Sequence, residues 1–324
     1  MKQSTLLFLL SIIVLTILIY ASDPEKVWHT LKNTNLFFLT IALIIISIDV
    51  IIRSIRWQHL LNKVEVKISL LQSLKLMIPS LFISNISPAK SAEPIRSVLL
   101  KKTNGVDVST SLPSIIVEKI LDIILTSLIS ATGIIFLIYG AVQFSAWILL
   151  IIFLYLILLS LLIFVLTSET RIKIITAKII SMFLFIKGIE KIGNEIVNFS
   201  LLTHQSFMKY NDTKCLFIAS VFTLLIWVLE GILFYVFFLA LNLEISPLLA
   251  FIMVPISTLV GIVSFLPGGI GSSEATLVIF ISPLSTLTPA EILATALLKR
   301  IIVLIAQGTI GAFCISSIFY QPKI

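Results

Sequence analysis

Several charged side chains of this sequence lie inside long apolar stretches, and they are the first candidates for chemistry. Glu118, Lys119 and Asp122 share one such stretch, and Lys299 and Arg300 share another. A charged group at the centre of a membrane helix costs about 2.5–3.5 kcal/mol on insertion scales. Charges that are retained at this cost usually face a polar path or pair with one another. Glu118, Lys119, Asp122 and Arg300 therefore predict a polar cavity at membrane depth.

Two further candidates, Glu93 and Glu274, lie where proline and small residues interrupt an apolar run. The first interruption extends over residues 84–96 and the second over residues 265–275. Four of the twelve glycines lie between Gly261 and Gly271. Backbone that leaves a helix at membrane depth needs hydrogen-bond partners, which only protein or a water-filled cavity can supply. We therefore expect both interruptions to border the polar cavity.

The two interruptions are followed by basic residues at the same distance along the chain. The interval from Glu93 to Lys119 equals the interval from Glu274 to Arg300. The spacing suggests an internal repeat of a broken segment, a connector and a span with a buried charge. Transporter folds are often built from such repeats, with the binding site at their interface. Coincidence is the alternative, because the two copies share few identical residues.

A simpler structural reading is that these charges pair with one another and hold the helices together. Asp49 and Arg53 fit this reading, because they are four residues apart near a cytoplasmic helix end, where they could reach the interface. Lys119 and Asp122 are three residues apart and can also pair, while Glu118 shares a helix face with Asp122.

The glutamates of the interruptions also have a simple alternative role at helix starts. Ser91 and Ser272 are candidate N-caps, and Glu93 and Glu274 would then be first-turn acids that the helix dipole favours. Glu230 has no nearby partner in the sequence, so it is either neutral or paired across helices. For the charges around the interruptions we favour the polar cavity.

The elements that position these residues are membrane helices. Of the 324 residues, 58% are hydrophobic and 12% are charged, with a mean hydropathy of +1.15. Soluble domains contain about 25% charged residues, so a soluble protein is excluded. Seven apolar runs have about the length that crosses a bilayer: Leu6–Tyr20, Asn35–Ile52, Leu112–Tyr139, Ala141–Leu166, Cys215–Leu241, Leu248–Leu266 and Ile292–Phe319.

Two shorter apolar pieces, Ser69–Ile86 and Ala275–Leu287, flank the interruptions. We predict an all-α, polytopic helical membrane protein with about seven full spans and two broken or re-entrant helical segments. Residues 1–324 form a single integral membrane domain. The first run is interpreted as a membrane span rather than a cleaved signal peptide, because it lacks a convincing cleavage site.

The net charge of +7 is distributed in a membrane pattern rather than a nucleic-acid pattern. Basic connections alternate with neutral or slightly acidic ones, which predicts a multi-pass protein of the cell membrane with the N-terminus and the basic connections in the cytoplasm. Residues 168–214 form a basic, amphipathic segment within the domain. We expect one or two helices on the inner leaflet there, with anionic headgroups as partners. A helical hairpin without lipid contact is the alternative.

Motifs of known catalytic chemistry are missing from the sequence. It has no HExxH zinc motif, no phosphate-binding loop of the Walker type and no GxSxG elbow. Cys215 and Cys314 lie in apolar helices without CxxC spacing, so a disulfide framework is not expected. We predict no cofactor, no metal and no catalytic residue, and nucleic acid is not a predicted partner.

The order of these motifs resembles the lysylphosphatidylglycerol synthase transmembrane region, also called the flippase-like family. The resemblance covers nearly the whole chain and has three parts. An Asn…Pro…Glu…Arg segment comes first, a Glu-basic…Asp motif follows in the next helix, and a Leu-Pro-Gly-Gly-x-Gly…Glu segment comes later. The matching positions are Asn85, Pro88, Glu93, Arg96, Glu118, Lys119, Asp122, Leu266–Gly271, Glu274 and, in the final helix, Arg300.

This chain departs from the family pattern at three positions. Ala92 replaces a usual glycine, Pro94 follows the first glutamate, and Lys119 replaces a usual arginine. Lysine keeps the charge but lacks the two-pronged guanidinium, which changes any phosphate contact there. The sequence given also ends soon after its last apolar run, so we expect the translocating region without the soluble synthase domain that some members carry.

The resemblance implies a flippase-like protein that moves a phospholipid or a polyprenyl-linked lipid headgroup between leaflets. Arg96, Lys119 and Arg300 would contact phosphate, and the acidic residues would balance these charges or hold a cationic headgroup. Two other classes stay open: the partner of a lipid-headgroup-modifying enzyme on a separate chain, and an ion-coupled transporter of small solutes. The predicted substrate-binding residues are Asn85, Glu93, Arg96, Glu118, Lys119, Asp122, Gly268, Gly269, Gly271, Glu274 and Arg300.

Overall fold

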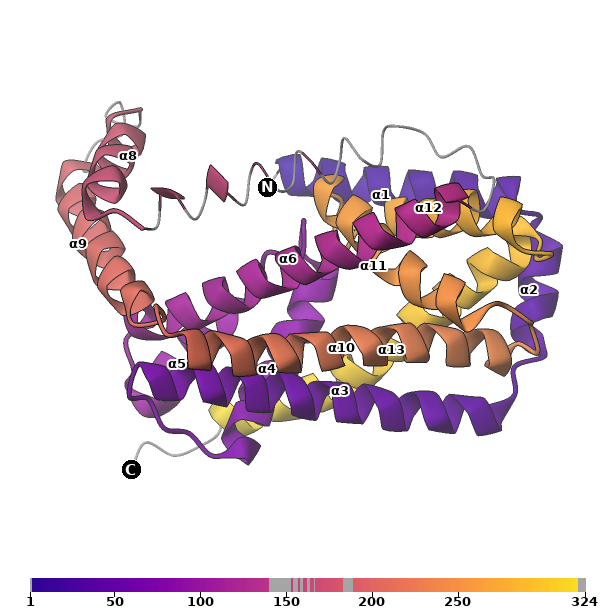
Figure 1. Ribbon diagram of the computed structural model, residues 1–324, viewed down its shortest axis with the longest axis horizontal. Helices are drawn as coiled ribbons and strands as arrows, with labels where there is room; N and C mark the ends of the chain where they lie inside the picture. The colour runs from indigo at the N-terminus through magenta and orange to yellow at the C-terminus, as the bar shows by residue number, and fades with distance from the viewer. Residues whose placement is uncertain are drawn as a thin grey trace.

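The computed structural model describes residues 2–139, 167–182 and 189–319, with a few single positions between 153 and 165. In this part of the chain the regular structure is helical (Figure 1). The predicted span Ala141–Leu166 falls outside the described residues except at those single positions. The helices are α1 Lys2–Ala21, α2 Pro24–Lys32, α3 Leu36–Lys63, α4 Leu70–Ile86, α5 Ile95–Asn104, α6 Val108–Tyr139, α8 Glu169–Met182, α9 Ile189–Met208, α10 Thr213–Ala240, α11 Pro247–Val263, α12 Ser272–Ile281, η1 Ser282–Leu284 and α13 Pro289–Phe319.

Helix length and composition confirm the predicted helical membrane fold. Among the described residues, α3, α10 and α13 are long and apolar enough to cross a bilayer, and α1 with α2 forms a bent pair that would be a fourth crossing. α6 extends over 32 residues, about 48 Å at 1.5 Å per residue. It contains Glu118, Lys119 and Asp122, the charged residues that were predicted to lie inside an apolar span. The run Leu248–Leu266, predicted as a full span, forms α11 and ends after only 17 helical residues. The chain is thus a multi-pass membrane protein.

Four consecutive helices occur twice with nearly identical lengths. α3, α4, α5 and α6 have 28, 17, 10 and 32 residues, and α10, α11, α12 and α13 have 28, 17, 10 and 31. Each 17-residue helix also contains one proline in its interior, Pro79 in α4 and Pro255 in α11. The repeat suggested by the spacing of charges therefore extends over four helices.

The two copies have opposite directions. α3 and α10 pack side by side (Figure 1), and the N–H of Asn35 at the start of α3 donates to the carbonyl of Ala240 at the end of α10, at 2.6 Å. At the other end of the pair, Lys63 contacts Asp212 at 2.5 Å, and this hydrogen bond holds the pKa of the Asp212 carboxyl below its usual range. The two helices are therefore antiparallel, as in inverted-topology repeats.

In each copy the two shorter helices form a broken hairpin. The first hairpin consists of α4, residues 87–94 and α5; the second consists of α11, residues 264–271 and α12. The first arm of each hairpin packs against the long last helix of the other copy, α4 against α13 and α11 against α6. Glycines permit the close approach, since the backbone of Gly311 lies beside Pro79 and that of Gly133 lies beside Ile252. The two copies are thus interlocked.

The non-helical tips of the two hairpins contact each other. Pro88 and Pro267 form an isolated antiparallel bridge, and the N–H of Gly268 donates to the carbonyl of Ser87 at 2.8 Å. Gly268 has a φ of 59°, and a Cβ there would collide with the carbonyl oxygen of Asn85. Only glycine satisfies both the left-handed backbone and this contact. The tips therefore supply partners for backbone that has left the helix.

The basic segment 168–214 forms α8 and α9, which pack against each other, and α9 packs against α6. Figure 1 shows the pair beside one end of the bundle. Apolar side chains of both helices are exposed, among them Ile174, Phe199 and Leu202. The packing of α8 against α9 agrees with the helical hairpin that was the alternative. Contact of these helices with the inner leaflet stays a prediction.

Substitution of Gly268 by alanine tests the contact between the tips. Gly105, at the end of α5, has a φ of 71° but open space around it, so Gly105→Ala is the matched control. We expect Gly105→Ala to lower the free energy of unfolding by about 1–2 kcal/mol, through backbone strain alone. Gly268→Ala should lower the melting temperature in detergent considerably more, because the added methyl also meets backbone. Equal effects of the two substitutions would contradict the tip contact.

Candidate functional site

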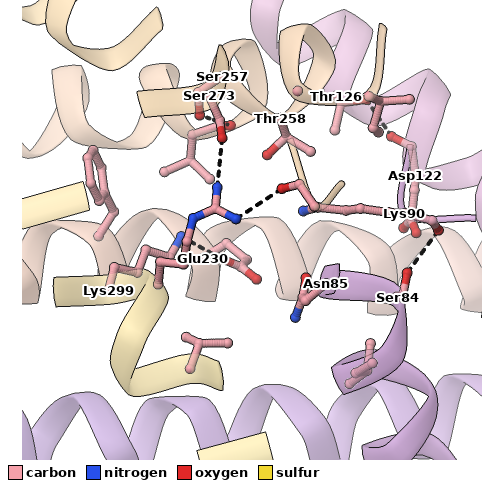
Figure 2. A pocket seen from close by; sticks show the side chains of 18 of the residues that line it. Ser84, Asn85, Lys90, Asp122, Thr126, Glu230, Ser257, Thr258, Ser273 and Lys299 are labelled. Carbon is pink, nitrogen blue, oxygen red and sulfur yellow. Dashed lines mark hydrogen bonds and ion pairs between the residues drawn. The ribbon is translucent and has the colours of Figure 1, made fainter. Parts of the chain in front are cut away.

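A cavity of about 220 Å³ lies beside the tips of the two hairpins. It could hold several water molecules, each of which occupies roughly 30 Å³ in the liquid. α3, α4, α6, α10, α11, α12 and α13 all contribute side chains, and Figure 2 shows polar groups from several of them directed into the space. The charged residues that line it are Asp49, Arg53, Lys90, Glu93, Lys119, Asp122, Glu230, Glu274, Lys299 and Arg300.

Arg300 of α13 holds the tip of the second hairpin. Its Nε donates to Glu274 at 2.6 Å, and its two terminal nitrogens donate to the carbonyl of Gly268 at 3.0 Å and to the hydroxyl of Ser273 at 2.9 Å. Glu274 in turn accepts a hydrogen bond from the N–H of Gly271 at 2.7 Å. The guanidinium therefore donates hydrogen bonds to both the backbone and the side chains of the broken segment. A buried charge needs such hydrogen-bond partners.

Lys119 of α6 makes the equivalent contact in the first hairpin, because its ammonium is paired with Glu93. In both copies the glutamate of the broken segment thus pairs with the basic residue that the equal intervals had singled out. The sequence spacing reflects a repeated ion pair across the cavity.

Glu230 of α10 joins the two copies at the centre of the site. It accepts from Lys299 at 2.8 Å and from Arg53 at 3.1 Å, so the reading that it pairs across helices is confirmed. Arg53 also contacts Asp49 at 2.6 Å, which confirms that predicted pair. The place of this pair near the interface stays a prediction, and α3 continues for ten residues past Arg53 to Lys63. That is about 15 Å further along the helix.

A second cluster lies behind the cavity wall, where Arg56 and Arg96 meet Glu118. Arg56 contacts Glu118 at 3.2 Å and Asp122 at 2.7 Å, and Arg96 is paired with the other oxygen of Glu118. The guanidinium of Arg96 also lies 4.9 Å from the ring centroid of Trp57. This packing leaves the side chains of Arg96 and Glu118 with 2% and 0% exposure.

The predicted pair of Lys119 with Asp122 was therefore wrong. Each side chain has a partner elsewhere, Glu93 in the tip of the first hairpin for Lys119 and Arg56 of α3 for Asp122, and these contacts replace the local one. The shared face of Glu118 and Asp122 is confirmed, because both accept from Arg56.

The capping alternative holds only for the role of Glu274. α12 begins at Ser272 with Gly271 as its cap, so Ser272 is not the N-cap, but Glu274 is a first-turn acid and accepts from the N–H of Gly271. α5 begins at Ile95 after Pro94, so Ser91 is not its N-cap and Glu93 is not a first-turn acid. Glu93 lies before the helix and is available for Lys119.

The eleven residues predicted to bind substrate fall into two groups. Seven line the cavity, namely Asn85, Glu93, Lys119, Asp122, Gly268, Glu274 and Arg300. Arg96 and Glu118 lie in the cluster behind it, Gly269 packs on Gly261, and Gly271 packs on Val14 of α1. The predicted set omitted five charged residues that line the cavity, namely Asp49, Arg53, Lys90, Glu230 and Lys299.

The charges of the cavity and of the cluster behind it nearly balance. Seven cations, Arg53, Arg56, Lys90, Arg96, Lys119, Lys299 and Arg300, face six carboxylates, Asp49, Glu93, Glu118, Asp122, Glu230 and Glu274. Among the described residues, each of these carboxylates pairs with at least one cation. Seven cations against six carboxylates leave one positive charge in excess. The site is thus suited to a polar molecule with negative charge.

Comparison with known proteins finds similarity along nearly the whole chain. The family model of the lysylphosphatidylglycerol synthase TM region matches residues 6–311. A UPF0104 membrane protein of Methanothermobacter thermautotrophicus is 22% identical over 313 residues, which covers 93% of this chain and 91% of that protein. A UPF0104 membrane protein of Methanocaldococcus jannaschii is 22% identical over 326 residues, with 95% and 93% coverage.

Glu118 offers a direct test of the buried cluster. Glu118→Gln would leave Arg56 and Arg96 without their shared counter-charge, and breaking a buried pair in this way costs about 3–5 kcal/mol. We expect a marked loss of melting temperature in detergent. Glu169→Gln, at the exposed pair with Lys173, is the control and should change it little. A Glu118→Gln protein as stable as its control would show that the cluster is not a structural ion pair.

Proposed function

Because the chain belongs to the lysylphosphatidylglycerol synthase TM region family, we propose that it moves the polar headgroup of a membrane lipid between the two leaflets. The lipid would be a phospholipid or a polyprenyl-linked lipid. Its headgroup would enter the polar cavity between the hairpins, while its tails stay in the bilayer.

The observation that carries this proposal is the charged cavity between two broken hairpins of opposite direction. Inverted repeats place transporter binding sites near the bilayer midplane, where irregular backbone lines a cavity. A headgroup needs such a place, because it cannot cross hydrocarbon without polar partners. Apolar lipid tails need none, so a cavity of headgroup size is sufficient.

The cationic lining supports phosphate as the recognised group. The side chains of Lys119 and Arg300 are 36% and 20% exposed, so both can reach a molecule in the cavity. Arg96, which the sequence also suggested for phosphate, is enclosed by Glu118 and Trp57. We assign it to support of α6 instead.

The distribution of charge supports an orientation with the basic end in the cytoplasm. Lys63, Lys101 and Lys209 lie at the end of the bundle where α3 meets α10 and α5 meets α6, and their acidic contacts are Asp212, Asp107 and Glu65. Positively charged connections favour the cytoplasmic side. The N-terminus would lie on the same side.

This orientation predicts opposite labelling of two engineered cysteines in a cell. Lys101→Cys at the basic end should react with an impermeant maleimide only after the membrane is opened. Asn33→Cys, at the other end beside Asn242, should react in intact cells. The two native cysteines are buried, which keeps the background low. The reverse pattern would contradict the orientation.

Leaflet exchange of headgroup-labelled lipids in proteoliposomes tests the function itself. We expect exchange by the wild type and a loss of at least about tenfold in Glu93→Gln and in Glu274→Gln, because each leaves a basic partner unpaired in the cavity. Glu244→Gln, at an exposed position between α10 and α11, is the control and should exchange normally.

Melting temperatures of the same variants separate misfolding from lost transport. Full exchange by both folded glutamate variants would remove these residues from the mechanism. No exchange by the wild type of anionic, zwitterionic or polyprenyl-phosphate lipids would contradict lipid movement, and would favour the partner of a headgroup-modifying enzyme.

A further inference from the structure

Lys90, in the tip of the first hairpin, is the cation of the cavity that has no counter-charge. Among the described residues, no carboxylate lies within 4.0 Å of its ammonium, whereas Lys119, Lys299 and Arg300 are each paired. The side chain lines the cavity, and Figure 2 shows it extended into that space. Its ammonium therefore accounts for the one positive charge in excess.

The backbone of Lys90 is unfavourable for lysine. Its φ is 53°, in the left-handed region that side chains with a Cβ avoid. Lys90 precedes Glu93 by three residues, as Gly271 precedes Glu274, and Gly271 also has a positive φ of 89°. The second hairpin thus has glycine where the first has lysine. Ala89 before Lys90 also has a positive φ of 50°, so the turn is strained at two non-glycine residues, and residues of this kind cluster at functional sites.

An unpaired ammonium in a cavity inside the protein attracts an anion more strongly than it would in bulk water, because protein screens charge less than bulk water does. Lysine presents three N–H donors from a compact charge, which suits the oxygens of a phosphate group. With one positive charge in excess, a ligand with a single negative charge would make the site neutral. A phosphodiester carries that charge, whereas a zwitterionic headgroup would bring a second cation.

We propose that the ammonium of Lys90 binds the phosphate of an anionic phosphodiester lipid in this cavity. The lipid source of the phosphate rests on the proposed function. Inorganic phosphate offers the same oxygens and is the other source of this chemistry. Neighbouring Asn85 lines the same space, and its amide is held by Gln307 at 2.8 Å.

Binding in detergent tests the site without any need for transport. The ligands are dioctanoyl phosphatidylglycerol, dioctanoyl phosphatidylcholine and inorganic phosphate, titrated against wild type, Lys90→Gln and Lys90→Arg. We expect wild type to bind dioctanoyl phosphatidylglycerol more tightly than the other two ligands. Lys90→Gln should weaken this binding about tenfold, which corresponds to about 1.4 kcal/mol. Lys90→Arg should bind nearly as wild type. Lys67→Gln, at an exposed position between α3 and α4, is the charge-matched control.

Lys90→Gly separates the ligand role from the fold. Glycine relieves the left-handed backbone, so this variant should melt at the same temperature as wild type or higher, yet bind the anionic lipid as weakly as Lys90→Gln. Equal affinity of wild type, Lys90→Gln and Lys90→Gly would overturn the proposal. Tighter binding of inorganic phosphate than of the lipid would overturn the lipid assignment.

Exchange measurements on the same proteins distinguish this proposal from the proposed function. Binding that depends on Lys90 without any exchange by wild type would support the site and contradict lipid movement. Exchange that is the same in Lys90→Gln, for anionic and zwitterionic lipids alike, would support lipid movement and contradict the role of Lys90.

Discussion

Backbone without helical hydrogen bonds at membrane depth must find its partners inside the protein, and the rest of this structure depends on how that is done. The chain leaves the helix twice, and the two tips bond to each other through Ser87 and Gly268. Arg300 adds a bond to the carbonyl of Gly268. Because glycine alone fits the tip, the broken segments lie close enough for their charged neighbours to enclose one cavity.

The inverted repeat explains why the charges are tolerated. Each hairpin packs on the long helix of the other copy, so side chains from both copies converge on one place. The pairs Glu93–Lys119 and Glu274–Arg300 repeat one interaction, and Glu230 links the copies through Arg53 and Lys299. Except for Lys90, the cost of burying each charge is offset by its partner, which leaves a cavity that is polar but almost neutral. Under the proposed function, such a balance would let a weakly charged headgroup both enter and leave the cavity.

The sequence predicted the membrane fold, the two broken segments and the charged residues, because apolar length, proline and intramembrane charge are local signals. It could not predict which charges pair. Lys119 has a possible partner three residues away in Asp122, but its contact with Glu93 depends on how α6 packs on the hairpin. Likewise, the apolar run that forms α11 is long enough for a span, and only its position as a hairpin arm shows why it ends early. Lys90 was not predicted as a site residue because a single lysine two residues after a proline resembles an ordinary loop residue, and its φ is not a sequence property.

The central claim is that a lipid headgroup occupies the cavity between the two hairpins. An experimental structure of the protein with a short-chain phosphatidylglycerol would test this most directly. We expect phosphate density within the cavity, between the first hairpin and α13, with the acyl chains leaving toward the bilayer. Lipid density confined to the outer surface of the bundle, with the cavity holding water alone at saturating lipid, would contradict the account.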